Sequence, residues 1–580
     1  MPTDGTKPRK EARLALRTTR RDVLRGIGAV ACAGAAITPS SAAEAQSSLA
    51  GSNPFPQILR QPELVTAFGD DSTPIKLTKS GASWSAQDLH LALEEKDQSL
   101  QLTATAPSTP FTRIHLRWRI PIATNLQVLG DAWERSYGEL GWRQIVPEQP
   151  MPWYFLLSDG KSTHGFGVQT GAPAFAFWQC DPEGISLWLD TRNGGRGVVL
   201  GQRSLDLATI LAHQGSPDED SFAAAQAFCR ILSPKPRLPA GPIYGSNDWY
   251  YAYGKSSAQD ILRDADLMAE LAPTSGPRPF TVLDEGWEHN PLFPSMPRLA
   301  SQIRAKGVRP GIWVRPLRAR GETDKSLLLP AARFGSRKER DPENLAYDPT
   351  IPEARHKALD TIRFAVEWKY ELVKHDFTTF DLLGQWGNEM GPSPTLPGWS
   401  FHDRSQTNAE IIRNLYQDIR QTAGDQTIIV GCNVVGHLSA GFFESQRTGD
   451  DVSGKIWERT RRMGVNTLAF RLPQHNTFFT MDPDCIPITE AIPWPLTKNW
   501  LNAVANAGAA LVVSPSQGIM DAEKKVAVRA AFAIAATQNP AATPKNWLDS
   551  RTPEAWTRRS DQTTMTYEWL EAEGAYPFEV

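Results

Sequence analysis

The sequence predicts a multidomain protein in which an N-terminal antiparallel β-sandwich precedes a (β/α)8 barrel and a short C-terminal β tail. Three observations support this prediction. The chain of 580 residues is too long for one ordinary hydrophobic core. From about residue 60 to 230, short segments alternate between apolar and polar residues. After about residue 241, short apolar runs alternate instead with longer helical patterns.

Residues 1–45 have the pattern of a twin-arginine signal peptide. The paired Arg20 and Arg21 precede the apolar run GIGAVACAGAAI, which is too short to span a bilayer, and an Ala-x-Ala cleavage site ends at Ala45. We therefore expect bacterial export to the periplasm or beyond, with no membrane anchor. Without this segment the chain holds 53 basic and 60 acidic residues, and its net charge of −7 argues against a nucleic-acid partner.

Cysteine and histidine spacings give no sign of a metal or a cofactor. The four cysteines beyond residue 45 match neither a disulfide framework nor a zinc motif; they are Cys180, Cys229, Cys432 and Cys485. The ten histidines include no pair at ligand spacing, and no predicted strand ends on His-x-His. A metal-dependent barrel hydrolase is accordingly disfavoured, and no cofactor is expected.

Residues 46–232 are predicted to form the sandwich. Segments such as IHLRWRIPI, WYFLLSDG, HGFGVQTG, ISLWLDTR and GVVLGQRSL show period-2 alternation with turn residues between them. The stretch SPKPRLPAGP at 233–242 has the composition of a linker. Period-2 alternation indicates antiparallel strands with one buried face.

Residues 241–535 are predicted to form the barrel, and 536–580 a short tail or small sheet. The eight strand candidates are PIYGSND, PFTVLDEGW, RPGIWVRP, YELVKHD, TIIVGCN, GFFESQR, TFFTMDPD and AALVVSP. Helical patterns such as SSAQDILRDADLMAELA and ARHKALDTIRFAVEWK separate several of them. Repeated βα units of this kind are typical of a (β/α)8 barrel.

Each apolar run ends on a polar or unusual residue, in order Asp248, Asp284, Arg315, Asp376, Cys432, Arg447, Asp482 and Ser514. In such barrels the active site lies at the C-terminal ends of the strands. Strands often stop at polar residues for other reasons. Several carboxylates together with Trp287 and Trp313 nevertheless favour a carbohydrate site, because tryptophan faces stack on sugars.

Lys374 and Asp376 lie two residues apart at the end of one strand and so point to the same face. They either form a structural ion pair or face a ligand. Cleavage of a glycosidic bond needs two carboxyl groups, and Asp376 is a candidate nucleophile whose ionised form Lys374 would favour. The second carboxylate is expected at Asp450 or Asp451. Two neighbouring anions raise each other's pKa, as a general acid requires, whereas Arg447 would lower it. Taken alone, the sequence Gly-Asp-Asp is commonly a turn.

The motifs together resemble glycoside hydrolase family 36, the bacterial α-galactosidase type, over about residues 241–515. The resemblance is carried by YGSNDWYYAYG, TVLDEGW, GVRPGIWVRP, LVKHDF, the segment IIVGCNVVGHLSAGFFESQRTGDDV and TMDPDC. It implies that Asp376 is the nucleophile and Asp451 the acid/base, with Asp450 as the alternative. The sugar subsite would include Asp284, Glu285, Trp313, Lys374, Cys432 and Arg447, and Trp133 would reach the barrel mouth from a loop of the β domain.

The sequence also departs from that family. Asp284-Glu285 replaces the Asp-Asp pair of that family. Arg315 ends a strand that often has glutamate there. The Arg315 side chain would either bind an acidic sugar or pair with Glu285. The connection 382–403 is long enough to cover part of the pocket, with Trp386 or Trp399 available to stack on a second sugar. The insertion 321–350 would do the same or be a solvated excursion.

The expected function is an exported retaining glycoside hydrolase that cleaves terminal α-linked sugars, with a carbohydrate as its partner. A transglycosylase with the same nucleophile and a non-catalytic glycan-binding barrel are the alternatives, and the sequence selects no oligomeric state. The presence of two candidate carboxylates favours an enzyme over a binding protein.

Overall fold

The computed structural model describes residues 58–339, 344–537 and 541–576. The predicted signal peptide, residues 1–45, lies outside these described residues, so export stays a prediction. Among the helices in the described ranges, none combines the length and the apolar character needed to cross a membrane.

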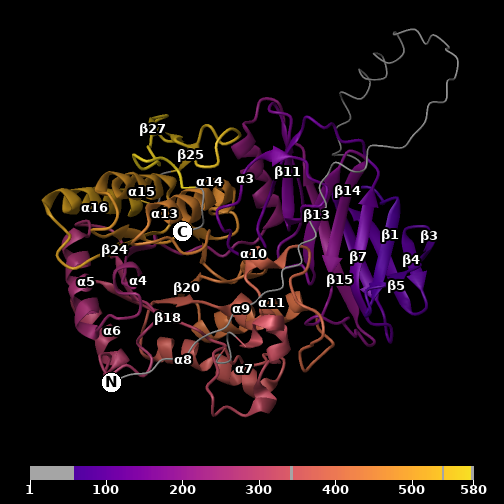
Figure 1. Ribbon diagram of the computed structural model, residues 1–580, viewed down its shortest axis with the longest axis horizontal. Helices are drawn as coiled ribbons and strands as arrows, with labels where there is room; N and C mark the ends of the chain where they lie inside the picture. The colour runs from indigo at the N-terminus through magenta and orange to yellow at the C-terminus, as the bar shows by residue number, and fades with distance from the viewer. Residues whose placement is uncertain (1–57, 340–343, 538–540, 577–580) are drawn as a thin grey trace, which may run out of the picture. The chain divides into compact units, whose positions relative to one another are not determined.

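The N-terminal region forms two antiparallel sheets, as its period-2 alternation predicts (Figure 1). The six-stranded sheet has the order β10 (Met151–Pro152), β13 (Phe175–Asp181), β14 (Gly184–Asp190), β7 (Phe111–Trp118), β1 (Leu64–Gly69) and β2 (Pro74–Ile75). The nine-stranded sheet has the order β3 (Thr78–Ser80), β4 (Ser83–Ala86), β5 (Leu89–Lys96), β6 (Ser99–Thr105), β15 (Ser204–His213), β12 (Thr163–Val168), β11 (Tyr154–Ser158), β8 (Gln127–Gly130) and β9 (Arg143–Gln144). In β5, Leu89, Leu91 and Leu93 are buried and alternate with exposed residues, which is the pattern of a half-buried strand.

Helix α3 (Ser221–Leu232) covers part of the second sheet. The Asp220 side chain accepts a hydrogen bond from the backbone N–H of Ala223 and so caps its first turn. Phe228 of α3 lies directly over Gly165 of β12, where a Cβ would come within 2.3 Å of the ring. The glycine therefore allows the helix to approach the sheet closely.

The C-terminal region contains one sheet of nine segments that pair only in parallel. Their order is β22 (Thr480–Asp482), β21 (Ser445–Arg447), β20 (Ile428–Gly431), β19 (Leu372–His375), β18 (Arg309–Val314), β17 (Phe280–Leu283), β16 (Tyr244–Asn247), β24 (Leu511–Pro515) and β23 (Ile486–Ile488). Each of the eight predicted runs contains one of these segments, and the ninth, β23, was not predicted. The two end segments, β22 and β23, are separated only by residues 483–485.

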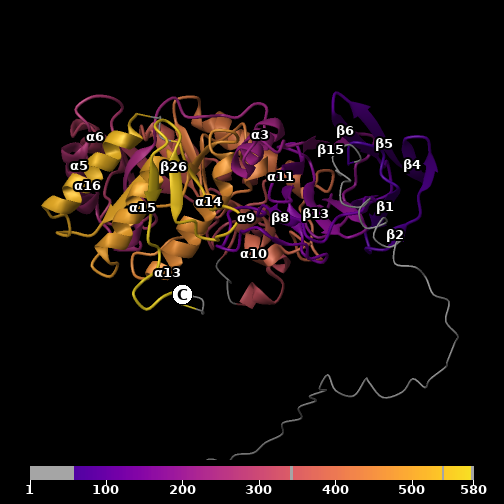
Figure 2. The ribbon, with the colours of Figure 1, turned by 90° about the horizontal axis from the view of Figure 1, so that it is seen from above.

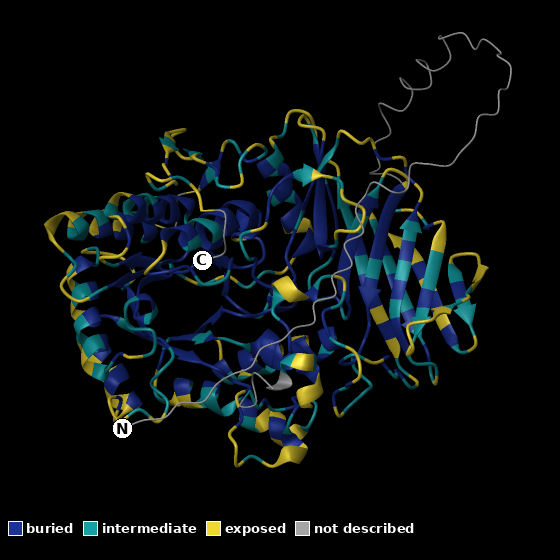
Figure 3. Ribbon diagram, in the orientation of Figure 1, coloured by how far each residue is buried: buried dark blue, intermediate teal, exposed yellow. Residues whose placement is uncertain are grey.

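Helices separate many of the parallel strands, and the longer ones, such as α5, α6 and α11, bury one face and expose the other (Figure 3). They are α4 (Trp249–Ala252), α5 (Ala258–Leu271), α6 (Met296–Ala305), α7 (Pro352–Ala358), α8 (Asp360–Glu367), α9 (Thr378–Leu383), α10 (Gly387–Met390), α11 (Asn408–Ala423), α12 (Gly436–Ser439), α13 (Trp457–Thr460), α14 (Thr467–Arg471), α15 (Trp494–Ala507) and α16 (Ala522–Ala535). Shorter turns are η1 (Lys325–Leu327), η2 (Ala331–Glu339), the π-helical η3 (Arg461–Asn466) and η4 (Leu472–Gln474). In Figures 1 and 2, α15 and α16 lie side by side.

The tail folds as a small three-stranded antiparallel sheet of β25 (Ala542–Pro544), β26 (Ala555–Arg558) and β27 (Thr564–Thr566). Trp547 anchors it, because its ring packs edge-on against Trp142 and its Nε1–H donates to the carbonyl of Ala469. The tail therefore contacts both the antiparallel and the parallel parts of the chain.

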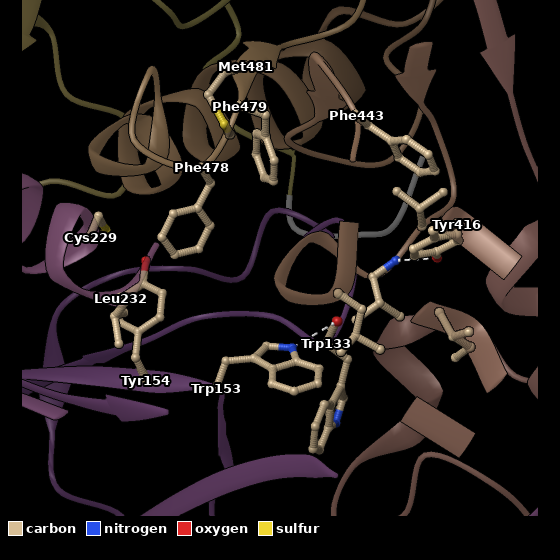
Figure 4. Packing of buried hydrophobic residues seen from close by; sticks show 14 of the residues in the cluster. Trp133, Trp153, Tyr154, Cys229, Leu232, Tyr416, Phe443, Phe478, Phe479 and Met481 are labelled. Atoms are coloured by element: carbon tan, nitrogen blue, oxygen red, sulfur yellow. Dashed lines mark hydrogen bonds between the residues drawn. The ribbon is translucent and has the colours of Figure 1, made fainter. Parts of the chain in front are cut away.

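A continuous hydrophobic core joins the antiparallel sheets to the barrel-type region. Figure 4 shows its centre, where Trp153 donates a hydrogen bond of 3.0 Å to the carbonyl oxygen of Trp133. The Trp153 ring stacks on His437 of α12, with ring centroids 5.0 Å apart, and Phe478 packs edge-on against the same histidine. This packing places the connection between β8 and β9 next to the ends of the parallel strands.

Candidate active site

A cavity of about 460 Å3 lies at the C-terminal ends of the parallel strands. The strand-end residues that line it are Asp284, Glu285, Trp313, Lys374, Asp376, Asp450 and Asp451. The structure thus brings together seven of the ten residues that the sequence singled out as catalytic, substrate-binding or the alternative acid/base.

Asp376 follows β19 and is held at the cavity wall by two hydrogen bonds. Its Oδ1 accepts from the backbone N–H of Phe377 at 2.7 Å, and its Oδ2 accepts from Trp313 Nε1 at 3.3 Å. Phe377 has a positive φ of 63°, a conformation rare for a bulky residue and typical of functional sites. The backbone turn therefore fixes the direction of the carboxylate.

Lys374 does not pair with Asp376. Its Nζ lies 2.7 Å from Oδ2 of Asp284, which also accepts a hydrogen bond of 2.7 Å from Asn247. Burial lowers the pKa of Lys374, but the charge of Asp284 outweighs this and raises it well above its usual value. The expected ion pair between Lys374 and Asp376 is not formed: the direct partner of Lys374 is Asp284, which follows β17, two strands away in the sheet.

Asp450 and Asp451 differ sharply in their surroundings. Arg135 binds Asp450 Oδ1 at 2.7 Å, and Arg459 binds its Oδ2 at 2.7 Å, so both oxygens are engaged. Asp451 uses only Oδ1, which lies 3.1 Å from Arg447 and 3.5 Å from Arg135. Its Oδ2 has no hydrogen-bond or ion-pair partner among the described residues, and the side chain is 38% exposed.

The positive charges around Asp451 also decide its protonation state. Burial raises the pKa of this carboxyl, but Arg447, Arg135 and Lys374 together outweigh burial and lower the pKa to about 2. The sequence left open whether a neighbouring carboxylate would raise the pKa of this acid or Arg447 would lower it. At Asp451 the cations prevail, and two of them, Arg447 and Arg135, contact Oδ1 directly.

Arg135 and Tyr137 line the cavity from the connection between β8 and β9, and sequence reasoning missed both. Backbone hydrogen bonds fix this connection to the loop after β21: Ser136 N–H donates to Thr448 O at 3.0 Å, and Asp450 N–H donates to Ser136 O at 2.8 Å. Strand-end analysis cannot find such residues, since they come from a different part of the chain. An arginine between aromatic residues in WERSY was the only signal.

Glu134 supports this connection from beneath. The carboxylate is fully buried and accepts hydrogen bonds from Tyr137 Oη, Asn433 Nδ2 and the backbone N–H of Gly387. It therefore ties three separate segments together: the connection after β8, the loop after β20 and the connection 382–403.

Trp133 does not line this cavity, so its prediction as a residue of the sugar subsite beside Asp376 is wrong; it borders a second, adjacent cavity instead. It is 3% exposed, packs against Trp153 and Phe175, and donates its Nε1–H to the carbonyl of Gly391. The segment reaches the cavity as predicted, but through Arg135 and Tyr137. Trp133 points back into the hydrophobic core.

Cys432 and Arg447 lie behind the cavity wall rather than on its surface. Both are buried, and Arg447 donates to Cys432 Sγ at 3.2 Å and to Asp484 Oδ2 at 2.7 Å. Arg447 also contacts Asp451, so it acts on the cavity through that carboxylate. Asp484, in the Asp-Pro-Asp-Cys segment, is buried and supports Arg447 from behind the cavity.

Arg315 has a different partner from either predicted one. It binds Asp381 at 2.5 Å and Asn344 at 3.0 Å and is buried away from the cavity. Glu285 instead lies 3.6 Å from Arg318. Arg315 is thus neither a rim cation nor the partner of Glu285, because the helix α9 presents Asp381 closer to it.

The connection 382–403 contributes Trp386 and Asn388 to the cavity. Trp386 stacks on Phe380, with ring centroids 4.3 Å apart, and lies 5.5 Å from the guanidinium of Arg135. Trp399 is buried against Phe401 and does not line the cavity. No described residue of the insertion 321–350 lines the cavity either.

Within the described ranges, no cluster of three or more His, Cys, Asp or Glu side chains is arranged to hold a metal ion. The side chains that line the cavity are chiefly carboxylates, cations and aromatic rings.

Neither a scan of family models nor a search of curated proteins found a match. Solved structures did match. The α-galactosidase TtGalA from Thermus thermophilus, solved with p-nitrophenyl α-D-galactopyranoside, aligns with a TM-score of 0.55 at 16% identity, covering 83% of this chain and 97% of that one. The chain has the fold of these α-galactosidases.

Two enzymes from Geobacillus stearothermophilus, named as family 36 α-galactosidases, extend the comparison. An AgaA variant solved with 1-deoxygalactonojirimycin has a TM-score of 0.56 at 12% identity, covering 85% of this chain and 79% of that one. AgaB has a TM-score of 0.55 at 11% identity, covering 82% and 75%. The family 36 resemblance noted from the sequence is thereby confirmed for the fold.

Proposed function

We propose that the protein is a retaining glycoside hydrolase that removes terminal α-linked sugars, with α-galactosides as the leading substrate class. The observation that carries this proposal is the presence of Asp376 and Asp451 in one cavity with the Lys374–Asp284 pair and Trp313. Two carboxyl groups supply the chemistry of glycoside cleavage, and charged groups with an aromatic face bind a sugar ring. The structures of TtGalA with stachyose and with an aryl α-galactoside support the substrate class by analogy of fold.

In the proposed mechanism, Asp376 attacks the anomeric carbon while Asp451 gives a proton to the leaving oxygen. The carbon–oxygen bond breaks, and the sugar is held as an ester on Asp376. Water then enters, Asp451 takes one of its protons, and the ester is hydrolysed with the original anomeric configuration restored. The two hydrogen bonds to Asp376 orient it for the attack.

Asp451, and not Asp450, is assigned the acid/base role because of its unpaired oxygen. Asp451 lines the cavity and its Oδ2 has no partner among the described residues, whereas both oxygens of Asp450 are bound by Arg135 and Arg459. An oxygen engaged with a guanidinium cannot also exchange a proton with the substrate. Asp450 would instead hold the two arginines in place.

The low pKa of Asp451 suits hydrolysis of the ester, in which Asp451 accepts a proton, better than cleavage of the glycosidic bond, in which it donates one. Its carboxylate form accepts a proton from water readily, but the protonated form is scarce at neutral pH. Unactivated glycosides should therefore be cleaved faster as the pH falls toward the acidic range. Aryl glycosides with good leaving groups need less protonation and should show a weaker dependence.

We also infer that β22 and β23 are two halves of one strand, so that the parallel sheet closes as an eight-stranded barrel through residues 483–485. On this view the sandwich spans 46–232, the barrel 241–535 and the tail 536–580.

Export through the twin-arginine route is proposed from residues 1–45. Cell fractionation of the wild type and an Arg20→Lys, Arg21→Lys variant tests it, since export by this route requires the pair.

The function is tested by hydrolysis of aryl α-glycosides of galactose, N-acetylgalactosamine, glucose, fucose and arabinose. Wild type, Asp376→Ala and the control Asp218→Ala are compared, because Asp218 lies on an exposed connection far in sequence from the cavity residues. We expect wild type and Asp218→Ala to hydrolyse one of these glycosides equally well, and Asp376→Ala to hydrolyse it at least about 10³-fold more slowly. Unchanged activity in Asp376→Ala would overturn the nucleophile, and inversion in the first product seen by NMR would overturn retention.

A further inference from the structure

A second cavity of about 410 Å3 borders the first one. The two share three lining residues, Tyr137, Asn388 and Arg462. The second cavity then runs over β8, the connection 131–142 and residues 149–152. A ligand longer than one sugar can therefore extend from Asp451 past Arg462, on the side where the leaving group departs.

Arg462 is a half-buried cation at this junction, and its charge is not neutralised. Its side chain makes no hydrogen bond, ion pair or ring contact with any residue in the described ranges. The other cations of the first cavity are engaged: Lys374 by Asp284, and Arg135 and Arg459 by Asp450. Arg462 differs from them in having its donors available to a ligand.

The nearby acids are already committed to other partners. Among those that line the two cavities, Asp131 pairs with Arg471 and Glu285 with Arg318, while Glu139 accepts the backbone N–H of Tyr137. None of the acids in the described ranges lies within ion-pair distance of Arg462. A negative charge at the junction must then come from the ligand.

The position of Arg462 is built by the fold rather than left to a flexible surface loop. It lies in the π-helical turn η3, and such turns occur often at functional sites. Gly138, at φ 77°, packs so closely on this turn that a Cβ would lie 2.8 Å from Arg462 O. Asn466, at the end of the turn, donates to the carbonyls of Leu140 and Arg551.

A further cation lines the second cavity. Arg143 contacts only the carbonyl of Gln144, at 3.3 Å, and has no acidic partner among the described residues. Trp386 borders the first cavity beside Asn388, at the same end. The two cavities together therefore hold two cations, Arg462 and Arg143, that have no acidic partner among the described residues.

We propose that the substrate carries an anionic group, a carboxylate or a sulfate, on the sugar at the leaving-group side of the cleaved bond, and that Arg462 binds it. This inference rests on the proposed glycosidase activity. An arginine binds either anion through two parallel N–H donors. The bound anion would also offset part of the positive charge that surrounds Asp451.

The first test compares kcat/KM for 4-nitrophenyl α-galactoside and its 3-carboxy derivative. Wild type should favour the carboxylated substrate by about tenfold, chiefly through a lower KM, since a charge-assisted pair at a partly exposed site is worth about that factor. Arg462→Gln should bring the ratio close to one. Arg298→Gln is the matched control, because Arg298 is exposed on α6 and lines neither cavity.

A second test measures binding without catalysis, by saturation-transfer NMR with glucuronate, glucose 6-sulfate and glucose. Binding of glucuronate alone assigns a carboxylate, and binding of glucose 6-sulfate alone assigns a sulfate; either signal should vanish in Arg462→Gln. Equal signals from all three sugars in both proteins, or a wild-type kcat/KM ratio near one, would overturn the proposal.

The two proposals fail in different ways. If no aryl glycoside is hydrolysed while an anionic sugar still binds through Arg462, the glycosidase is refuted and the anion site stands. If hydrolysis depends on Asp376 but shows no preference for the anionic substrate, the anion site is refuted and the glycosidase stands.

Discussion

Replacing Arg135 by glutamine should move the basic limb of the pH–activity profile to higher pH. Arg135 contacts the carboxylates of both acids after β21, at 2.7 Å from Asp450 and 3.5 Å from Asp451. Removing it raises the pKa of Asp451, so the proton-donating form persists to higher pH. The direction follows because a cation stabilises the carboxylate form only.

The size of the change follows from the distance. Two unit charges 3.5 Å apart interact by about 1.2 kcal/mol at the dielectric constant of water, and this is about one pH unit. Asp451 is 38% exposed, so the true interaction lies between this value and that of a buried pair. We expect the basic limb to move up by about one to two pH units.

The assay is the full pH profile of kcat/KM on raffinose, whose leaving group needs protonation, and on 4-nitrophenyl α-galactoside. The change should be large for raffinose and small for the aryl substrate. Arg135→Lys restores the charge and serves as the control, and thermal unfolding reports whether the fold is kept. A basic limb that stays in place, or moves to lower pH, would refute the account of Asp451.

Three further predictions concern stability. Glu134→Ala leaves three buried donors without an acceptor and should lower the free energy of unfolding by about 3–5 kcal/mol in chemical denaturation, more than Glu134→Gln. Gly165→Ala should destabilise by at least about 1–3 kcal/mol because its Cβ would clash with Phe228, and Phe228→Leu should reduce this cost. Burial lowers the pKa of His375 and His475 to about 4 in the folded protein. As the pH is lowered from about 6.5 to about 4, these histidines gain protons in the unfolded chain before they do so in the folded one, so the melting temperature should decrease over this range.

Each of these predictions has a clear contrary result. Equal stability of wild type and Glu134→Ala would mean that water replaces the carboxylate. A Gly165→Ala variant as stable as wild type would show that α3 can move away from the sheet. A melting temperature that stays constant or rises on acidification to pH 4.5 would show that the buried histidines are protonated in the folded protein.

The sequence by itself determined where eight of the nine parallel segments lie and which polar residues follow them. Apolar runs and the residues that end them are local features, so Asp284, Asp376 and Arg447 could be placed at strand ends without a structure. The alternation in 60–230 likewise predicted antiparallel sheets. Because parallel strands end at one edge, this local information also predicted one cavity there.

Only the tertiary structure decided which charges meet. Lys374 pairs with Asp284 and not with its near neighbour Asp376, and Arg315 pairs with Asp381 on the following helix. Arg135 reaches the barrel-type region from more than 300 residues earlier in the chain than Asp450. A pairwise contact of this kind depends on how the sheet curves and how loops pack over its edge, and periodicity carries no information about either.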